Sequence, residues 1–289
     1  FSGLNALKEV KLPNDLTKLG NSAFYGCDQL KKVTIGASLT SLNAYAFDDC
    51  PKLKTVRVSK SNHVLYAKDN MLINKKKKSV IWIAPAKKKV VIPNGTKVIG
   101  DYCFYGSKAE SLVIPKSVKK IGKKALEASD LEKIRLKKGN KVYAKDGSCI
   151  YKKKTKELVV VTASKGGQVM KISPKVKKIT RDAMTAGDNF IVNDGSSLDY
   201  IVIPASTILC DSWYQFYKAG YITCDVVFRG KKLPKYSSGA QNIFPLFCTY
   251  YVPKGMVKKY KNWIKKTAPD YSSIIKVKTC TKKVKKSIK

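Results

Sequence analysis

Short hydrophobic segments recur along the chain at intervals of 22 or 23 residues. The first, residues 7–13, alternates apolar and polar side chains, and a matching segment begins at Leu30. Alternation with a period of two predicts a short strand that buries one face. Further copies contain Val90, Leu112, Ile172 and Leu198. Regular recurrence of this kind predicts a repeat architecture.

Each strand segment is followed by positions that hold one type of residue in successive copies. Proline ends the strand, where its missing N–H stops strand pairing, at Pro13, Pro93, Pro115 and Pro204. The next shared position, where we expect a positive φ, holds Gly20, Asn43, Gly100 and Gly122. The residues after it predict a short helical turn whose aromatic ring fills the coil at Phe24, Phe47 and Phe104. One unit cannot bury its apolar face alone, so the copies must stack into a solenoid.

The unit reads L-x-x-V-x-I-P-x-x-[VL]-x-x-I-G-x-x-A-F-x-x-C, and it resembles the BspA-type leucine-rich repeat family over roughly residues 1–210. The resemblance implies an α/β fold, a right-handed leucine-rich-repeat solenoid with short strands and short helical turns. Members of this family are mostly secreted or surface-attached proteins of bacteria and some eukaryotic parasites, linked to adhesion. The resemblance therefore implies a non-enzymatic interaction or adhesion module with an extracellular or bacterial cell-surface location.

A longer period accompanies the repeat. Residues 66–69, Tyr-Ala-Lys-Asp, recur 77 residues later as residues 143–146. Each copy leads into a strand, a lysine-rich turn and a second strand, which is the pattern of a β-hairpin. We expect two β-hairpin inserts, at about residues 62–87 and 141–165, that serve as spacers with solvated turns.

The repeat loosens after Pro204, which suggests a terminating segment. We assign residues 1–228 to the solenoid and residues 229–289 to a C-terminal capping segment and basic tail. Near-helical spacing predicts the buried face of a capping helix at Val257, Tyr260, Trp263 and Ile264. Because the sequence starts inside a repeat without a polar cap, we expect an N-terminal targeting region that is absent from this chain.

Charge adds a functional constraint. The chain carries 58 Lys and Arg residues against 20 Asp and Glu residues, a formal net charge of +38, and only four of the basic residues are arginines. The hydrophobic content of 44% is enough to build a core. No apolar run is long enough for a membrane span, and no signal peptide is visible. We expect a folded, strongly basic monomer.

The residue inventory excludes most catalytic chemistry. His63 is the sole histidine, which excludes a histidine-rich metal site and requires any histidine-based dyad or triad to use His63. None of the eight cysteines forms a C-x-x-C pair, which argues against a zinc knuckle. No nucleophile motif has a supporting context, and a carboxylate pair such as Asp48–Asp49 can be named only arbitrarily. We expect no enzyme, no catalytic residue, no metal and no cofactor.

The cysteines fall into two groups. Cys27 and Cys50 share a repeat column and are expected to be small, semi-buried packing residues with free thiols. The C-terminal cysteines are the candidates for a disulfide: Cys210, Cys224 and Cys248.

The outward side of the repeat strands gives one functional lead. Strand residues alternate between core and surface, and leucine-rich solenoids often bind partners on the concave strand face. We expect Thr34, Thr55 and Tyr200 to lie between the cations of this face. The predicted partner-binding residues are Lys11, Lys32, Arg57, Lys89, Lys133 and Arg135.

Lysine selects its partner by charge. A point charge on a flexible stem neutralises phosphate, sulfate or carboxylate without geometric selectivity, which predicts an acidic protein or an anionic polysaccharide such as a glycan or wall polymer. The alternative is a nucleic-acid-binding protein. Reading of bases favours arginine, and no nucleic-acid-binding signature is present, so we expect only adventitious nucleic-acid binding at low salt.

Overall fold

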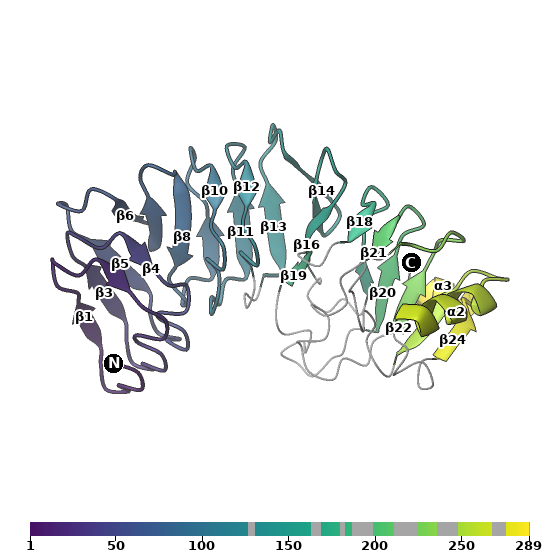
Figure 1. Ribbon diagram of the computed structural model, residues 1–289, viewed down its shortest axis with the longest axis horizontal. Coiled ribbons are helices and arrows are strands. Elements are labelled where there is room, and N and C mark those ends of the chain that lie inside the picture. Colours follow the sequence, from purple (N-terminus) through teal and green to yellow (C-terminus); the bar gives the residue numbers. More distant parts are fainter. Residues whose placement is uncertain are drawn as a thin grey trace. The chain divides into compact units, whose positions relative to one another are not determined.

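The structure, a computed structural model, describes residues 1–126, 131–162, 169–179, 183–186, 199–210, 225–235, 248–267 and 276–288. The chain divides into two compact units, Phe1–Val142 and Tyr143–Lys289. Figure 1 colours them from purple at the N-terminus to yellow at the C-terminus. Each unit is built as a β-solenoid, in which successive turns of the backbone pair through short parallel strands.

Two three-stranded parallel sheets carry the repeat strands of the N-terminal unit. The first contains β1 (Glu9–Lys11), β3 (Lys32–Ile35) and β5 (Thr55–Val58), and the second contains β9 (Lys89–Val91), β11 (Ser111–Ile114) and β13 (Lys133–Leu136). The short strands β2 (Lys18–Leu19) and β4 (Ser41–Leu42) pair separately. The register follows the repeat, because Val10 pairs with Val33 and Val33 with Val56. Residues at the same position in successive repeats therefore lie side by side, in one row across the sheet.

A third sheet of this unit joins repeat strands to antiparallel ones. Its strands β6 (Leu65–Lys68), β7 (Met71–Asn74) and β8 (Ser79–Ile83) pair antiparallel in chain order. On its other side, β8 pairs parallel with β10 (Val98–Ile99), which pairs with β12 (Lys120–Ile121). β8 thus belongs to both patterns: it pairs with β7 across the lysine-rich turn and also fills a strand position in the repeat stack.

The described residues of the C-terminal unit form one long parallel sheet and two smaller ones. The parallel sheet runs in the order β17 (Val169–Lys171), β20 (Tyr200–Ile203), β22 (Asp225–Phe228), β23 (Thr249–Val252) and β24 (Lys276–Thr279). A four-stranded sheet holds β14 (Tyr143–Asp146), β15 (Cys149–Lys152), β16 (Leu158–Thr162) and β19 (Met184–Ala186), while β18 (Lys178–Ile179) pairs with β21 (Leu209–Cys210). Parallel pairing continues from β22 to β23, so strands assigned to the capping segment extend the same sheet.

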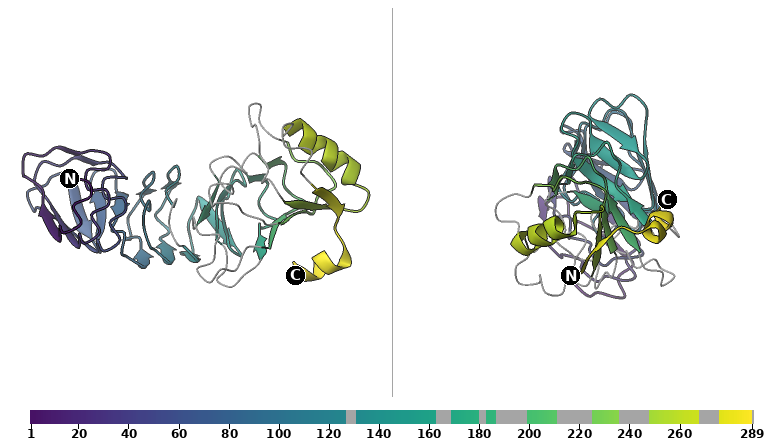
Figure 2. Two further views of the ribbon diagram at one scale, coloured as in Figure 1. Left: turned by 90° about the horizontal axis from the view of Figure 1, so that it is seen from below. Right: turned by 90° about the vertical axis from the view of Figure 1, so that its right-hand side faces the viewer.

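Two helices flank the long parallel sheet on opposite sides (Figure 2). On one face, α2 (Val257–Thr267) packs Tyr260, Trp263 and Ile264 into a core that also holds Phe228. On the other face, α3 (Lys282–Ser287) packs Val284 against Val202 and Val227. The apolar residues predicted to share a helix face therefore pack into one core. Whether the helix caps a solenoid stays a prediction.

The described repeats form turns where short helical turns were predicted. After Gly20, the backbone closes with one local hydrogen bond, in which the Tyr25 N–H donates to the Ser22 carbonyl at 3.1 Å. The Phe24 N–H donates instead to the carbonyl of Ala46 in the next turn at 2.8 Å. In an α-helix, a backbone amide bonds to the carbonyl four residues earlier in the same segment. The Phe24 amide instead bonds to the next turn of the solenoid. Helices of the described chain are therefore confined to α2 and α3, and β-solenoid describes the units better than α/β.

The aromatic column of the repeat lies inside the N-terminal unit. Phe24 stacks on Phe1 and on Phe47, with ring centroids 5.4 Å and 5.3 Å apart, and Phe47 contacts Trp82 at 5.4 Å. Phe24, Phe47 and Phe104 are all buried. Offset aromatic stacking adds stability beyond the area that the rings bury, so this ladder ties consecutive turns together.

The glycine column has another cause than the predicted positive φ. Gly20, Gly100 and Gly122 are not among the residues with positive φ, and the left-handed residues Ser22, Tyr102 and Lys124 lie two positions later in each copy. At Gly100 an added Cβ would lie 2.9 Å from the Val80 carbonyl oxygen, and at Gly122 it would lie 2.6 Å from the Asp101 amide nitrogen. Close approach of the backbone therefore selects glycine at these two positions, and the prediction of a positive φ there was wrong.

Candidate binding face

The outer strand face is the side of the sheets β1-β3-β5 and β9-β11-β13 that points away from the core. In the first sheet, one row across the strands holds Lys11, Thr34 and Arg57. The neighbouring row holds Glu9, Lys32 and Thr55. Lys11 and Arg57 are exposed, whereas Lys32 is half-buried. Three predicted binding residues therefore share one sheet surface.

The second sheet carries the other three. One row holds Lys89, Ser111 and Lys133, and the neighbouring row holds Val91, Val113 and Arg135. Lys89, Lys133 and Arg135 are exposed. The structure thus places all six residues on the outer strand face of the N-terminal unit, in two groups on two sheets.

Neutral residues separate the cations within each row. Parallel strands lie about 4.8 Å apart, so Lys11 and Arg57 are roughly 10 Å apart across Thr34. That separation is close to the Debye length at 0.1 M salt, which keeps their mutual repulsion small. Cations in one row therefore stand two strand spacings apart.

One of the six cations is already neutralised. The Lys32 ammonium lies 2.8 Å from the carboxylate of Glu9 on the neighbouring strand. Within the part of the chain that the structure describes, the other five form no ion pair. Five of the six therefore have no acidic partner among the described residues: Lys11, Arg57, Lys89, Lys133 and Arg135.

Tyr200 does not belong to this face. It lies on β20 in the C-terminal unit, where it is half-buried beside Tyr251 at a centroid distance of 6.3 Å. Burial raises the pKa of both phenols, and the nearby Asp225 carboxylate adds to the shift. Tyr200 also packs against an apolar cluster that includes Val284 of α3, a contact that the sequence pattern did not indicate.

The structure places the other sequence candidates at the surface and in a turn. His63 is exposed. Asp48 lies in a turn, where its carboxylate accepts the Asp49 N–H at 3.0 Å and burial raises its pKa. Among the described residues, no group of three His, Cys, Asp or Glu side chains could hold a metal ion. No described helix combines the length and apolarity that crossing a membrane requires.

The cysteine column forms buried thiols that bond between turns. Cys27 and Cys50 donate to the carbonyls of Phe1 at 3.2 Å and Phe24 at 3.0 Å. Burial raises the pKa of the Cys50 thiol to about 12, so this thiol stays protonated at neutral pH. The expectation of free thiols in this column is confirmed, and Cys27 and Cys50 are fully buried instead of semi-buried. Of the disulfide candidates, Cys248 is buried in a core cluster, while Cys224 and the side chain of Cys210 lie outside the described residues.

Comparison with solved structures returns bacterial leucine-rich repeat proteins. A leucine rich cell surface protein from Faecalibacterium prausnitzii is 19% identical over 81% of this chain and 60% of its own, with a TM-score of 0.44. The pneumococcal vaccine antigen PcpA is 17% identical over 94% of this chain and 68% of its own, with a TM-score of 0.44. A leucine-rich repeat protein from Eubacterium ventriosum is 22% identical over 86% and 67%, with a TM-score of 0.40.

The chain therefore spans about 60% of the length of the Faecalibacterium protein. No curated protein matches the sequence. The repeat itself is matched more specifically: six copies of the BspA type leucine rich repeat region are recognised across residues 1–85 and 83–163. Since this match covers more than half of the 289 residues, the protein belongs to the BspA-type leucine-rich repeat family.

Proposed function

We propose that this protein is a non-catalytic, cell-surface or secreted bacterial interaction module whose outer strand face binds acidic proteins or anionic polysaccharides. The observation that carries the proposal is the set of five exposed cations without an ion pair among the described residues of that face. Membership of the BspA-type family supports the interaction role, because leucine-rich solenoids present extended strand surfaces to their partners.

The scaffold in this proposal is a right-handed solenoid. The antiparallel strands at residues 62–87 and 141–165 act as spacers, and residues 229–289 act as a cap and basic tail. Parallel pairing that extends through β24 supports a cap that continues the sheet. A scaffold held by interstrand hydrogen bonds keeps its surface cations in fixed rows, which lowers the entropy lost when an extended partner binds.

Binding at this face rests on charge and repetition. The lysines attract phosphate, sulfate or carboxylate groups without a geometric requirement, while Arg57 and Arg135 can form two parallel hydrogen bonds with one carboxylate or sulfate. Several weak contacts along one chain of anions add up to a stable complex. Removing the face cations should therefore cost more affinity than removing equal charge elsewhere.

The test compares two variants of equal net charge. The face variant replaces Lys11, Arg57, Lys89, Lys133 and Arg135 with Gln. The control variant replaces five exposed lysines of α2 with Gln: Lys258, Lys259, Lys261, Lys265 and Lys266. Binding to heparin oligosaccharides, wall teichoic acid, polyglutamate and a DNA duplex is measured at physiological ionic strength.

We expect the face variant to lose at least tenfold in affinity for a glycan, wall polymer or polyglutamate, and the control variant to stay within about threefold of the wild type. Equal losses in both variants would mean that binding follows net charge, and the assignment to this face would be wrong. Tight DNA binding at this salt concentration, without comparable binding to the other three probes, would instead identify a nucleic-acid-binding protein.

A further inference from the structure

A pocket of about 760 Å³ lies in the C-terminal unit, at one edge of its long parallel sheet. The strands β22, β23 and β24 run parallel, and the pocket is lined by residues that end these strands or follow them directly, among them Arg229, Pro253 and Cys280. One end of the pocket is bounded by Lys285 and Ile288, in and just after α3. Its volume falls within the range of small-molecule pockets.

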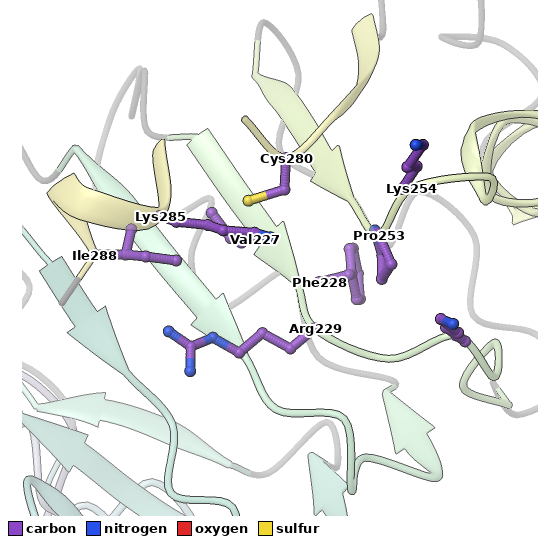
Figure 3. Close-up of a pocket in the computed structure, with 9 residues that line it drawn as sticks. Val227, Phe228, Arg229, Pro253, Lys254, Cys280, Lys285 and Ile288 are labelled. Carbon is purple, nitrogen blue, oxygen red and sulfur yellow. The ribbon is translucent and has the colours of Figure 1, made fainter. Parts of the chain in front are cut away.

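The lining combines an apolar body with positive charge. Val227 and Ile288 contribute apolar side chains on the α3 side of the sheet, while Phe228, whose ring packs into the core beneath α2, lines the pocket beside them. Four cations share the lining, Arg229, Lys231, Lys254 and Lys285, and none of the described lining residues is acidic. None of the four forms an ion pair with a described residue. Figure 3 shows the Arg229 and Lys285 side chains extending toward the space between β22 and α3, where Val227 and Ile288 also point.

The loop that carries two of these cations is held in place. The hydroxyl of the buried Tyr260 donates a hydrogen bond to the Gly230 carbonyl at 2.8 Å. Gly230 is itself packed, because an added Cβ would lie 3.2 Å from the Lys232 carbonyl oxygen and 3.5 Å from the Cα of Ala205. Arg229 and Lys231 therefore project from an anchored segment, and this lowers the entropy that a ligand must remove.

We infer that this pocket binds a small amphiphilic anion, in which a carboxylate, phosphate or sulfonate group is attached to an apolar aromatic or aliphatic body. Apolar side chains take the body out of water, which is favourable in proportion to the area buried. The guanidinium of Arg229 and the ammonium of Lys285 take the charged group, since charge-assisted hydrogen bonds are the stronger kind. The site is in the C-terminal unit, so the inference does not depend on the outer strand face.

The test uses 8-anilinonaphthalene-1-sulfonate as the probe and the whole chain as the protein. Its neutral relative N-phenyl-1-naphthylamine has the same aromatic body without the sulfonate, and inorganic sulfate supplies an anion without the body. Fluorescence titration should give one saturable site for the sulfonate. Affinity for the neutral relative should be at least tenfold weaker, and sulfate alone should compete only weakly.

The pocket variant Arg229→Gln/Lys285→Gln should bind the sulfonate at least tenfold more weakly. The matched control Lys261→Gln/Lys265→Gln removes two exposed charges from α2 and should bind like the wild type. Equal affinity of the pocket variant and the wild type, or equal affinity of both probes for the wild type, would overturn the inference.

A second measurement locates the probe without any substitution. Cys280 is partly exposed and lines the pocket, so bound sulfonate should slow its alkylation by iodoacetamide, as read by peptide mass spectrometry. An alkylation rate that does not change at saturating probe would place the probe elsewhere and reject the site. Because this assay uses the wild-type chain, it decides the question even if the pocket variant does not fold.

Discussion

At the scale of single residues, the repeat requires a left-handed backbone position just before its cysteine column. Glycine holds that position in three copies, with φ of 72° at Gly3, 66° at Gly26 and 68° at Gly106. In the copy that follows Gly26, Asp49 holds it with φ of 54°. A side chain in the left-handed region costs roughly 1–2 kcal/mol, although aspartate tolerates it better than most residues. The strain at Asp49 is local, since the equivalent glycine at position 26 has open space around it.

Asp49→Gly should therefore raise the free energy of unfolding by up to about 1 kcal/mol, because relief of the strain exceeds the added entropy of the unfolded chain. Gly26→Ala introduces the same strain at the equivalent position and should lower that free energy by about 1–2 kcal/mol. Urea unfolding of both variants checks the pair. Destabilisation by Asp49→Gly would show that the aspartate side chain supports its turn.

The thiols give a second prediction at this scale. Burial raises the pKa of Cys50 to about 12 and of Cys149 to about 11, and the thiolate is the form that reacts with alkylating reagents. At pH 8 iodoacetamide should modify the partly exposed Cys280 at least tenfold faster than Cys50 or Cys149. In denaturant the three rates should become similar. Fast modification of Cys50 in the native protein would mean that the turns open locally.

At the scale of elements, two buried asparagines mark the points where repeat turns lead into antiparallel strands. The Asn62 amide donates to the carbonyls of Gly36 at 3.0 Å and Leu39 at 2.9 Å, and its oxygen accepts the N–H groups of Val64 and Leu65. Asn140 donates to the Val118 carbonyl at 3.0 Å in the same manner. Each asparagine satisfies the backbone of the preceding turn just before β6 or β14 begins.

Asn62→Ala should lower the free energy of unfolding by about 2–4 kcal/mol, because buried carbonyl and amide groups lose their partner. Asn74→Ala is the matched control. The Asn74 side chain accepts the Lys77 N–H at 2.9 Å in the exposed turn before β8, where water replaces the lost bond, so the cost should stay below about 1 kcal/mol. Thermal and urea unfolding of both variants test the difference, and equal costs would contradict a special role for Asn62.

At the scale of the whole molecule, net charge opposes folding. The sequence carries +38, and the ion pairs seen among the described residues join partly or fully exposed side chains, each worth less than about 1 kcal/mol. The β-solenoid units therefore fold against self-repulsion between their lysines. Salt shortens the range of that repulsion, from about 10 Å at 0.1 M to about 3 Å at 1 M.

The melting temperature should accordingly rise by roughly 2–6 °C between 0.02 M and 0.5 M sodium chloride, which corresponds to one or two kcal/mol for a chain of this size. Differential scanning fluorimetry measures the rise. The variant with five α2 lysines replaced by Gln should show a smaller rise than the wild type. A melting temperature that falls with salt would mean that ion pairs outweigh repulsion.

The repeat pattern alone determined the family, the short strands and the buried Phe24 column, because each depends on residues at fixed spacing within one copy. The six face cations were also predictable, since alternation along a strand decides which side chains leave the core. The reason for glycine in the glycine column was not predictable from the sequence. At Gly100 and Gly122, the close approach of backbone from the neighbouring turn selects glycine. The residue pattern within a single repeat does not indicate how closely the backbone of the next turn approaches it.

Only the tertiary structure decided how elements distant in sequence meet. Strand pairing showed that Lys32 is neutralised by Glu9, which leaves five of the six predicted cations for a partner. Packing of α3 on Val202 and Val227 removed Tyr200 from the predicted face. The cationic pocket of the C-terminal unit likewise combines residues from three separate segments. Local periodicity follows from the chemistry of neighbouring residues, whereas a site depends on which turns and helices the folded chain brings together.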